Sequence, residues 1–185
     1  MAAGTSLMLL PTDFFTDMAG KQIYNQYYLF NYEKVSGYLL LTVDRSNIMK
    51  VEKGQVRSFT IYDNSDHRFD FERLPAIDSE HYVQVLAQGE KYKVCKLIKT
   101  HFLASDFAHT AAGGVGNDYD QYQDNVEYYV LDVKSSQLQK LSSLKKKSLK
   151  AGFAKEEDKV DKFIDENSGN IDDTYLSNLG DYMNH

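Results

Sequence analysis

Short runs of hydrophobic residues, each bounded by turn-forming residues, fill the chain from about residue 22 to residue 141. In the run 55–63, neighbouring side chains alternate with the two-residue period that is typical of a β-strand. We expect strands at 22–31, 37–44, 47–51, 55–63, 68–74, 82–87, 92–102, 126–133 and 137–141. Because these runs are consecutive, short and joined by tight turns, with no helical stretch between them, they predict an antiparallel meander. Such a meander curls toward a barrel or folds into two layers.

The period of the pattern changes after residue 141. Apolar residues recur at helical spacing in 155–166 and again in 171–183, and 144–153 can form a short helix. Each of the last two helices has an apolar stripe with acids on its other side, so each is expected to pack on the sheet, on the other helix or on a partner protein. The predicted fold class is therefore α+β, mainly antiparallel β, followed by two to three short C-terminal helices.

These patterns divide the chain into an N-terminal segment, 1–21, an antiparallel β domain, 22–141, and a helical tail, 142–185, packed on the sheet. Inside the β domain the strand pattern fails over 104–125, a polar stretch that contains glycine. A loop of about twenty residues is unusual within a compact domain, and such loops are often functional or mobile. The pattern leaves open whether this stretch is a functional loop or a plain disordered excursion.

The composition excludes several classes of protein. A chain of 185 residues suits one domain, and its 42% hydrophobic content, with 14 Tyr and 10 Phe, argues against intrinsic disorder. No run approaches the roughly 18 apolar residues of a membrane-spanning helix. The formal net charge of −6 argues against a general nucleic-acid binder. We therefore expect no membrane span and no nucleic-acid partner.

The surplus of acid lies in the tail. Residues 155–185 hold nine Asp and Glu against three Lys, whereas 1–154 is balanced. Just before the tail lies a lysine cluster with no acid inside it: Lys140, Lys145, Lys146, Lys147 and Lys150. Such a cluster suits a phosphate, a lipid headgroup or an acidic partner. A helix start that pairs with the acidic tail behind it is the simpler interpretation.

No motif in the chain predicts an enzyme or a cofactor. The run Gly113–Gly116 resembles a phosphate-binding loop, but Asn117 and Asp118 follow where that motif needs Lys and then Ser or Thr. The five histidines form no zinc-binding spacing. The single cysteine, Cys95, lies among apolar residues, as a buried structural thiol would.

One acidic run offers oxygen ligands for a metal. Asp118, Asp120 and Asp124 lie close together in the sequence, and calcium favours carboxylates on a flexible loop. An EF-hand loop needs Gly at its sixth position and Glu at its twelfth, where this run has Gln123 and Tyr129. The three acids are therefore weak candidates for another kind of calcium site, and a solvated loop is the simpler interpretation.

Tyrosine is the unusual feature of the composition. Tyr24, Tyr27 and Tyr28 crowd the opening strand, and Tyr119 and Tyr122 lie in the 104–125 stretch. Tyrosine supplies a large, rigid contact area with a polar tip, which suits interfaces, and it also suits β-strands. These five tyrosines are the candidate binding residues.

Several segments together resemble an uncharacterised family of small exported proteins from Bacteroidetes bacteria. The similar features are the turn Asn31–Glu33, the strand Val56–Phe59, the hairpin strand Tyr82–Leu86, the strand Tyr128–Val130 and the helix start Lys145–Leu149. The resemblance covers about residues 22–166. It implies no activity and carries over no catalytic residue.

Members of that family usually begin with a signal peptide, so the resemblance implies a periplasmic or extracellular location. In this chain no Lys or Arg precedes Lys21, and a secretion signal begins with such charges. In this interpretation Met1 replaces or follows a lost signal.

The leading functional hypothesis is a non-enzymatic exported module that binds a protein partner in a cell-envelope assembly. Its contact surface would be the tyrosine-rich opening strands, the 104–125 loop or both. The alternative is a small-ligand carrier whose curled sheet encloses an aromatic-lined cavity. Neither hypothesis needs a cofactor.

Overall fold

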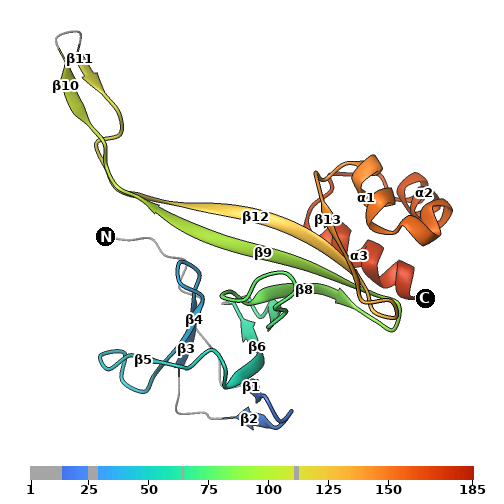
Figure 1. The fold of residues 1–185 in the computed structure, drawn as a ribbon, viewed down its shortest axis with the longest axis horizontal. Coiled ribbons are helices and arrows are strands. Elements are labelled where there is room, and N and C mark those ends of the chain that lie inside the picture. Colours follow the sequence, from blue (N-terminus) through green and yellow to red (C-terminus); the bar gives the residue numbers. More distant parts are fainter. Residues whose placement is uncertain (1–13, 25–28, 64, 111–112) are drawn as a thin grey trace.

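The computed structural model describes residues 14–24, 29–63, 65–110 and 113–185. Within these ranges the chain forms antiparallel sheets and a C-terminal group of helices (Figure 1). The strands are β1 (Phe14–Asp17), β2 (Gln22–Tyr24), β3 (Leu29–Glu33), β4 (Tyr38–Thr42), β5 (Met49–Lys50), β6 (Val56–Tyr62), β7 (Arg68–Glu72), β8 (Val83–Gln88), β9 (Tyr92–Leu103), β10 (Ala108–Thr110), β11 (Gly113–Val115), β12 (Gln121–Asp132) and β13 (Gln137–Leu141). The helices are α1 (Lys146–Gly152), α2 (Glu157–Glu166) and α3 (Asp173–Asn184), with a 3-10 turn, Ala154–Glu156, between α1 and α2.

The main sheet is an open antiparallel meander. Its described strands follow the order β13-β12-β9-β8-β7-β6-β1-β2, and each neighbouring pair is antiparallel. This arrangement confirms the predicted fold class. The barrel-like variant is not formed, because β13 and β2 stay at opposite edges of the sheet. Other layers bury the apolar face, so no closing strand pair is needed.

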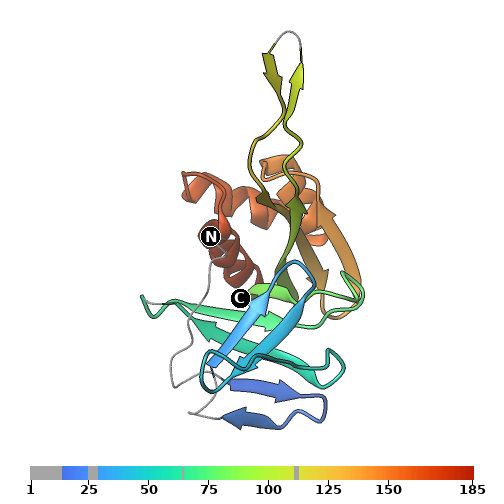
Figure 2. The ribbon, with the colours of Figure 1, turned by 90° about the vertical axis from the view of Figure 1, so that its left-hand side faces the viewer.

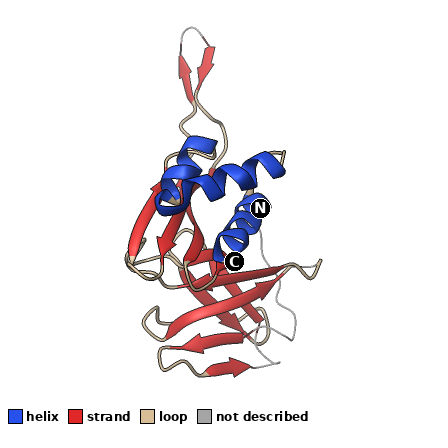
Figure 3. Cartoon of the chain, turned by 90° about the vertical axis from the view of Figure 1, so that its right-hand side faces the viewer, coloured by secondary structure: helices blue, strands red, loops and turns tan. Residues whose placement is uncertain are grey.

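One face of the main sheet carries two different layers. The strand register places Phe59, Phe71, Gln84, Lys96 and Tyr128 in one row across neighbouring strands, so their side chains leave the same face. At the β6–β7 end this face packs against the small sheet of β3, β4 and β5. At the β9–β12 end it packs against the helices (Figure 2, Figure 3).

The helices pack on the sheet, which is one of the arrangements expected from their apolar stripes. Their shared core consists of Ala87, Tyr92, Val94, Val130, Leu141, Leu149, Phe153, Val160, Phe163, Leu176, Leu179 and Met183. Two bonds fix the start of α3: Lys96 pairs with the Asp173 carboxylate, and the Tyr128 hydroxyl donates to the same group at 2.8 Å. Asp172 caps the helix by accepting from the Tyr175 N–H at 2.9 Å.

A second core joins the small sheet to the main one, and it is largely aromatic. The Phe59 and Phe71 rings stack with centroids 4.9 Å apart, and Tyr32 and Tyr82 pack around them. The Tyr82 hydroxyl donates to the Val56 carbonyl at 3.0 Å, so its polar atom is satisfied inside the core. Burial raises the pKa of Tyr82 to about 12. These tyrosines serve the fold.

The opposite face of the sheet is covered over only part of its width. Val83, Cys95, Leu97 and Tyr129 form a small core there, closed by Leu74 and Ile77 and by Leu138. Cys95 is fully buried, as its apolar surroundings in the sequence predict, and burial raises the pKa of its thiol to about 12. On β6 and β7 the same face carries polar side chains and stays open.

The first strands of the structure differ from those predicted from the sequence. The predicted strand 22–31 divides into β2 and β3, which belong to different sheets. The segment assigned to the N-terminus, 1–21, contributes β1 to the main sheet. In β1, Phe15 lies opposite Phe59 and its ring meets Phe30 at 5.7 Å, a long-range contact that no local pattern reveals.

Candidate functional site

A two-stranded ribbon made of β9 and β12 projects from the body of the molecule and ends in the β10–β11 hairpin (Figure 1, Figure 2). The body contacts this ribbon as far as Thr100 and Asp124. The Asp124 carboxylate accepts from the Thr100 hydroxyl and pairs with Lys34 at 3.3 Å, and Lys99 pairs with Asp78. We call residues 101–123, beyond these anchors, the arm.

The arm exposes several large apolar side chains. They are Phe102, Leu103, Phe107, Val115, Tyr119 and Tyr122, and each is between 39% and 61% exposed. Phe102 and Tyr122 are register partners on one face of the ribbon, with ring centroids 5.3 Å apart. A set of aromatic side chains on a projecting element is a typical protein-interaction surface.

The arm has a defined backbone that its glycines make possible. The Asp106 N–H donates to the Asn117 carbonyl at 3.1 Å, and the Asn117 N–H donates to the Asp106 carboxylate at 2.7 Å. Gly114 lies flat against the Phe107 ring, where a Cβ atom would come within 2.5 Å of it. Gly116 adopts a φ of +95° against the Asp106 backbone. The glycine run therefore shapes a hairpin, which explains its superficial similarity to a phosphate-binding loop.

About half of the stretch 104–125 is thus strand, where the sequence pattern indicates a loop. β10, β11 and the first part of β12 lie inside it. The pattern fails there because the arm has no buried face, so its side chains show no alternation of apolar and polar positions. Two of its exposed aromatic side chains, Phe102 and Phe107, are not among the residues that the sequence predicts for binding. These two side chains are exposed because the ribbon extends past the body, and the sequence pattern does not show how far it extends.

The structure brings together only part of the predicted tyrosine set. Tyr119 and Tyr122 lie on the arm and are 61% and 53% exposed. Tyr24 ends β2, an edge strand separated from β9 by four other strands in the order of the main sheet. Tyr27 and Tyr28 lie outside the described residues. Of the two predicted tyrosine groups, the one on the arm is therefore the group whose exposed side chains the structure describes.

The acidic run does not converge on a metal site. Asp120 accepts from the Ser105 N–H at 2.8 Å, and Asp124 is held by Thr100 and Lys34 at the base of the arm. The described part of the chain contains no group of three His, Cys, Asp or Glu side chains that could hold a metal ion.

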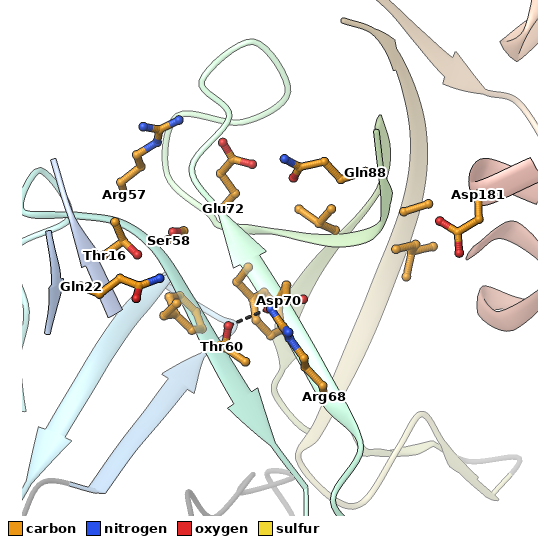
Figure 4. Close-up of a pocket in the computed structure, with 15 residues that line it drawn as sticks. Thr16, Gln22, Arg57, Ser58, Thr60, Arg68, Asp70, Glu72, Gln88 and Asp181 are labelled. Carbon is orange, nitrogen blue, oxygen red and sulfur yellow. Dashed lines mark hydrogen bonds and ion pairs between the residues drawn. The ribbon is translucent and has the colours of Figure 1, made fainter. Parts of the chain in front are cut away.

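A groove on the open face of the main sheet is the second candidate site. It has a volume of about 590 Å³ and is lined by side chains of β1, β2, β6, β7 and β8, with Asp181 of α3 at its rim (Figure 4). Its lining is mainly polar: the labelled residues are Thr16, Gln22, Arg57, Ser58, Thr60, Arg68, Asp70, Glu72, Gln88 and Asp181.

Much of the charge in this groove is internally neutralised. Arg68 pairs with Asp70 at 2.9 Å, and the Thr60 hydroxyl donates to the same carboxylate at 2.6 Å. The hydrogen bond to Asp70 raises the pKa of Arg68. Glu72 pairs with Lys93, which is itself buried. These pairs satisfy the polar face of the sheet without a ligand.

The lysine cluster pairs with acids on the body and tail. Lys140 contacts Glu127 at 2.6 Å, and Lys146 and Lys150 contact Asp161 at 3.2 and 2.7 Å. Hydrogen bonds from Lys150 and Lys146 lower the pKa of Asp161. The interpretation of this cluster as a helix start paired with the acidic tail is confirmed for Lys146 and Lys150.

None of the helices formed by the described residues has the length and apolar character needed to span a lipid bilayer. Comparison with known proteins found no matching family model, no matching curated protein and no matching solved structure. The contact surface is therefore inferred from the geometry of the chain itself.

Proposed function

We propose that this chain is a non-enzymatic protein-binding module, an accessory subunit of a cell-envelope assembly, and that the arm is its contact surface. The observation that carries the proposal is the set of exposed aromatic side chains on a projecting ribbon of two paired strands. The resemblance to exported Bacteroidetes proteins supports the envelope location.

Two physical arguments support a role for the arm in binding. An exposed apolar surface on a sheet edge invites association, and monomeric proteins usually keep such surfaces small or guarded by charge. The arm also contributes no residue to the buried cores of the described chain. Since the body does not need the arm for packing, its aromatic side chains are available to a partner.

The small-ligand carrier is the competing function. The aromatic residues that could line a cavity in the sheet, such as Phe59 and Phe71, are packed against one another, and the groove beside them is polar. A carried ligand would therefore have to be a polar molecule in that groove. Native mass spectrometry of gently purified protein tests this function, because a carrier retains a small molecule.

The experiment that tests the arm compares two double variants in affinity capture from fractionated cells of the source organism. Tyr119→Ala with Tyr122→Ala removes two aromatic side chains from the arm. Val43→Ala with Ile48→Ala is the matched control, since these residues are 55% and 62% exposed on a different hairpin.

We expect the control to retain the partner of the natural chain and the tyrosine variant to lose it by about tenfold or more, the scale of interface hot spots. Both variants should keep the melting temperature of the natural chain. Equal capture by the two variants would exclude the arm as the contact surface. Recovery of the natural chain as a lone protein would reject the subunit proposal.

A further inference from the structure

The charges of the arm indicate what kind of surface it binds, an inference that rests on the proposed function. Between Lys99 and Lys134 the sequence contains no Lys or Arg. The arm holds Asp106, Asp118 and Asp120, so its formal charge is −3 with histidine neutral. No ion pair joins any of these three acids to a cation within the described residues.

Several acids of the body are paired with cations. Glu72, Asp78, Glu127 and Asp161 each have a lysine partner on the body. At the base of the arm, Asp124 is paired with Lys34. Beyond this anchor the arm carries acids and no Lys or Arg of its own, and these acids lie among the exposed aromatic side chains.

This charge distribution disfavours three classes of partner. The arm of a second copy carries the same −3 charge, so pairing of two arms would place like charges together. Nucleic acids and anionic lipid surfaces would be repelled for the same reason. A basic protein surface is attracted, because opposite charges steer the encounter and set the orientation of the complex.

We propose that the arm docks on a protein surface that combines an apolar depression with a rim of Lys and Arg. The depression receives aromatic side chains of the arm, chiefly Phe102, Tyr119 and Tyr122, and the rim pairs with Asp118 and its neighbouring acids. Arginine suits this rim, since its guanidinium also packs on the faces of tyrosine rings.

Site-specific photocrosslinking in cells of the source organism identifies the surface that the arm touches. p-Benzoylphenylalanine replaces Tyr119 in the full chain, and in a control chain it replaces Ile48. We expect an adduct from position 119 and none to the same protein from position 48, with Lys and Arg flanking the crosslinked peptide of the partner. An adduct with a second copy of this chain, or with an acidic peptide, overturns the inference. The lack of any adduct from position 119 rejects the proposed function as well.

The partner captured in this way is then purified, and its affinity for the chain is measured while salt rises from about 0.05 to about 0.5 M, which shortens the screening length severalfold. We expect binding to weaken by about tenfold over this range. Asp118→Lys should weaken binding by about tenfold at low salt, and Asp118→Asn by about threefold. Asp118 suits this test because its exposed side chain makes no bond within the described structure.

Glu52→Lys is the matched control, because Glu52 is also exposed and its side chain makes no ion pair with the described residues. It should change the affinity by less than about twofold. If affinity is insensitive to both salt and Asp118→Lys while the tyrosine variant still abolishes binding, the proposed function stands and the basic-surface inference is wrong.

Discussion

At the scale of single residues, close contacts decide which side chains the chain tolerates. Gly180 is the clearest example: it lies inside α3, where glycine ordinarily costs helix stability. A Cβ atom at this position would come within 2.5 Å of the Ala87 Cβ and 2.8 Å of a Val94 methyl group. Glycine therefore lets α3 approach β8 and β9 closely enough to close the helical core.

Gly180→Ala should destabilise the protein despite its better helix propensity. Alanine gains about 1 kcal/mol as a helix former, whereas overpacking a core costs about 1–3 kcal/mol, so the net loss of stability should be up to about 2 kcal/mol. Chemical denaturation measures this change. Gly54→Ala is the control, because a Cβ at Gly54 meets nothing within 4 Å. Equal stability of the two variants would contradict the close packing of α3.

At the scale of elements, the arm is a separate unit attached to the sheet by two strands. Leu103 and Gln121 are register partners at the point where the ladder ends, and no residue of 104–120 belongs to a buried core. A two-stranded ribbon without a packed face contributes little stability of its own. We therefore expect the free energy of unfolding of the body to be largely independent of the arm.

Replacing residues 104–120 by Asn-Gly tests this separation. The dipeptide favours the tight turn that joins two paired antiparallel strands, so Leu103 and Gln121 keep their register. We expect the free energy of unfolding to change by less than about 1 kcal/mol, while partner binding is lost. A variant that fails to fold would mean that the arm stabilises the body and is not a separate binding element.

At the scale of the whole molecule, Asp78 and its partner His81 link three parts of the chain: the loop that contains them, β9 and the β3–β4 turn. Its carboxylate accepts from the His81 and Glu80 N–H groups of its own loop and pairs with Lys99 of β9. His81 in turn reaches the Val35 carbonyl in the β3–β4 turn at 3.4 Å. Burial alone would raise the pKa of Asp78, but the hydrogen bonds from Lys99 and His81 outweigh it and hold the pKa well below its usual range.

The lowered pKa of Asp78 gives the fold a predicted acid sensitivity. Since the carboxylate is held in its charged form, its contribution is complete above the unfolded pKa of about 4 and is lost as the pH falls toward the lower folded pKa. Asp78→Asn should cost about 1–3 kcal/mol near neutral pH and reduce the loss of stability below about pH 4. Denaturation at several pH values measures both effects, with Glu52→Gln as the control. An unchanged pH profile would show that Asp78 is not a main source of the acid sensitivity.

Local patterns were sufficient to predict most of the secondary structure that has a buried face. The two-residue alternation in β6 and the helical spacing in α2 and α3 arise because one side of each element packs on a core. The apolar residues therefore recur in the sequence with the period of the strand or the helix. The antiparallel order of the sheet follows from short turns between consecutive strands. The pairing of Lys146 and Lys150 with the acidic tail could also be anticipated, because opposite charges lie near each other in the sequence.

Only the tertiary structure decided where the chain presents a free surface. The pairing of β1 with β6 and the division of the opening run between two sheets depend on contacts such as Phe15 with Phe30, which local periodicity does not encode. The arm has no buried face, so its sequence shows no alternation of apolar and polar residues. Its strands nevertheless continue the β9–β12 pairing that begins on the body. The sequence by itself determined the fold class and the two tyrosines of the arm. The tertiary structure placed Phe102, Phe107 and a set of acids without ion pairs on the same surface as these tyrosines. The exposure of a side chain and the pairing of a charge depend on tertiary contacts, which the local sequence does not encode.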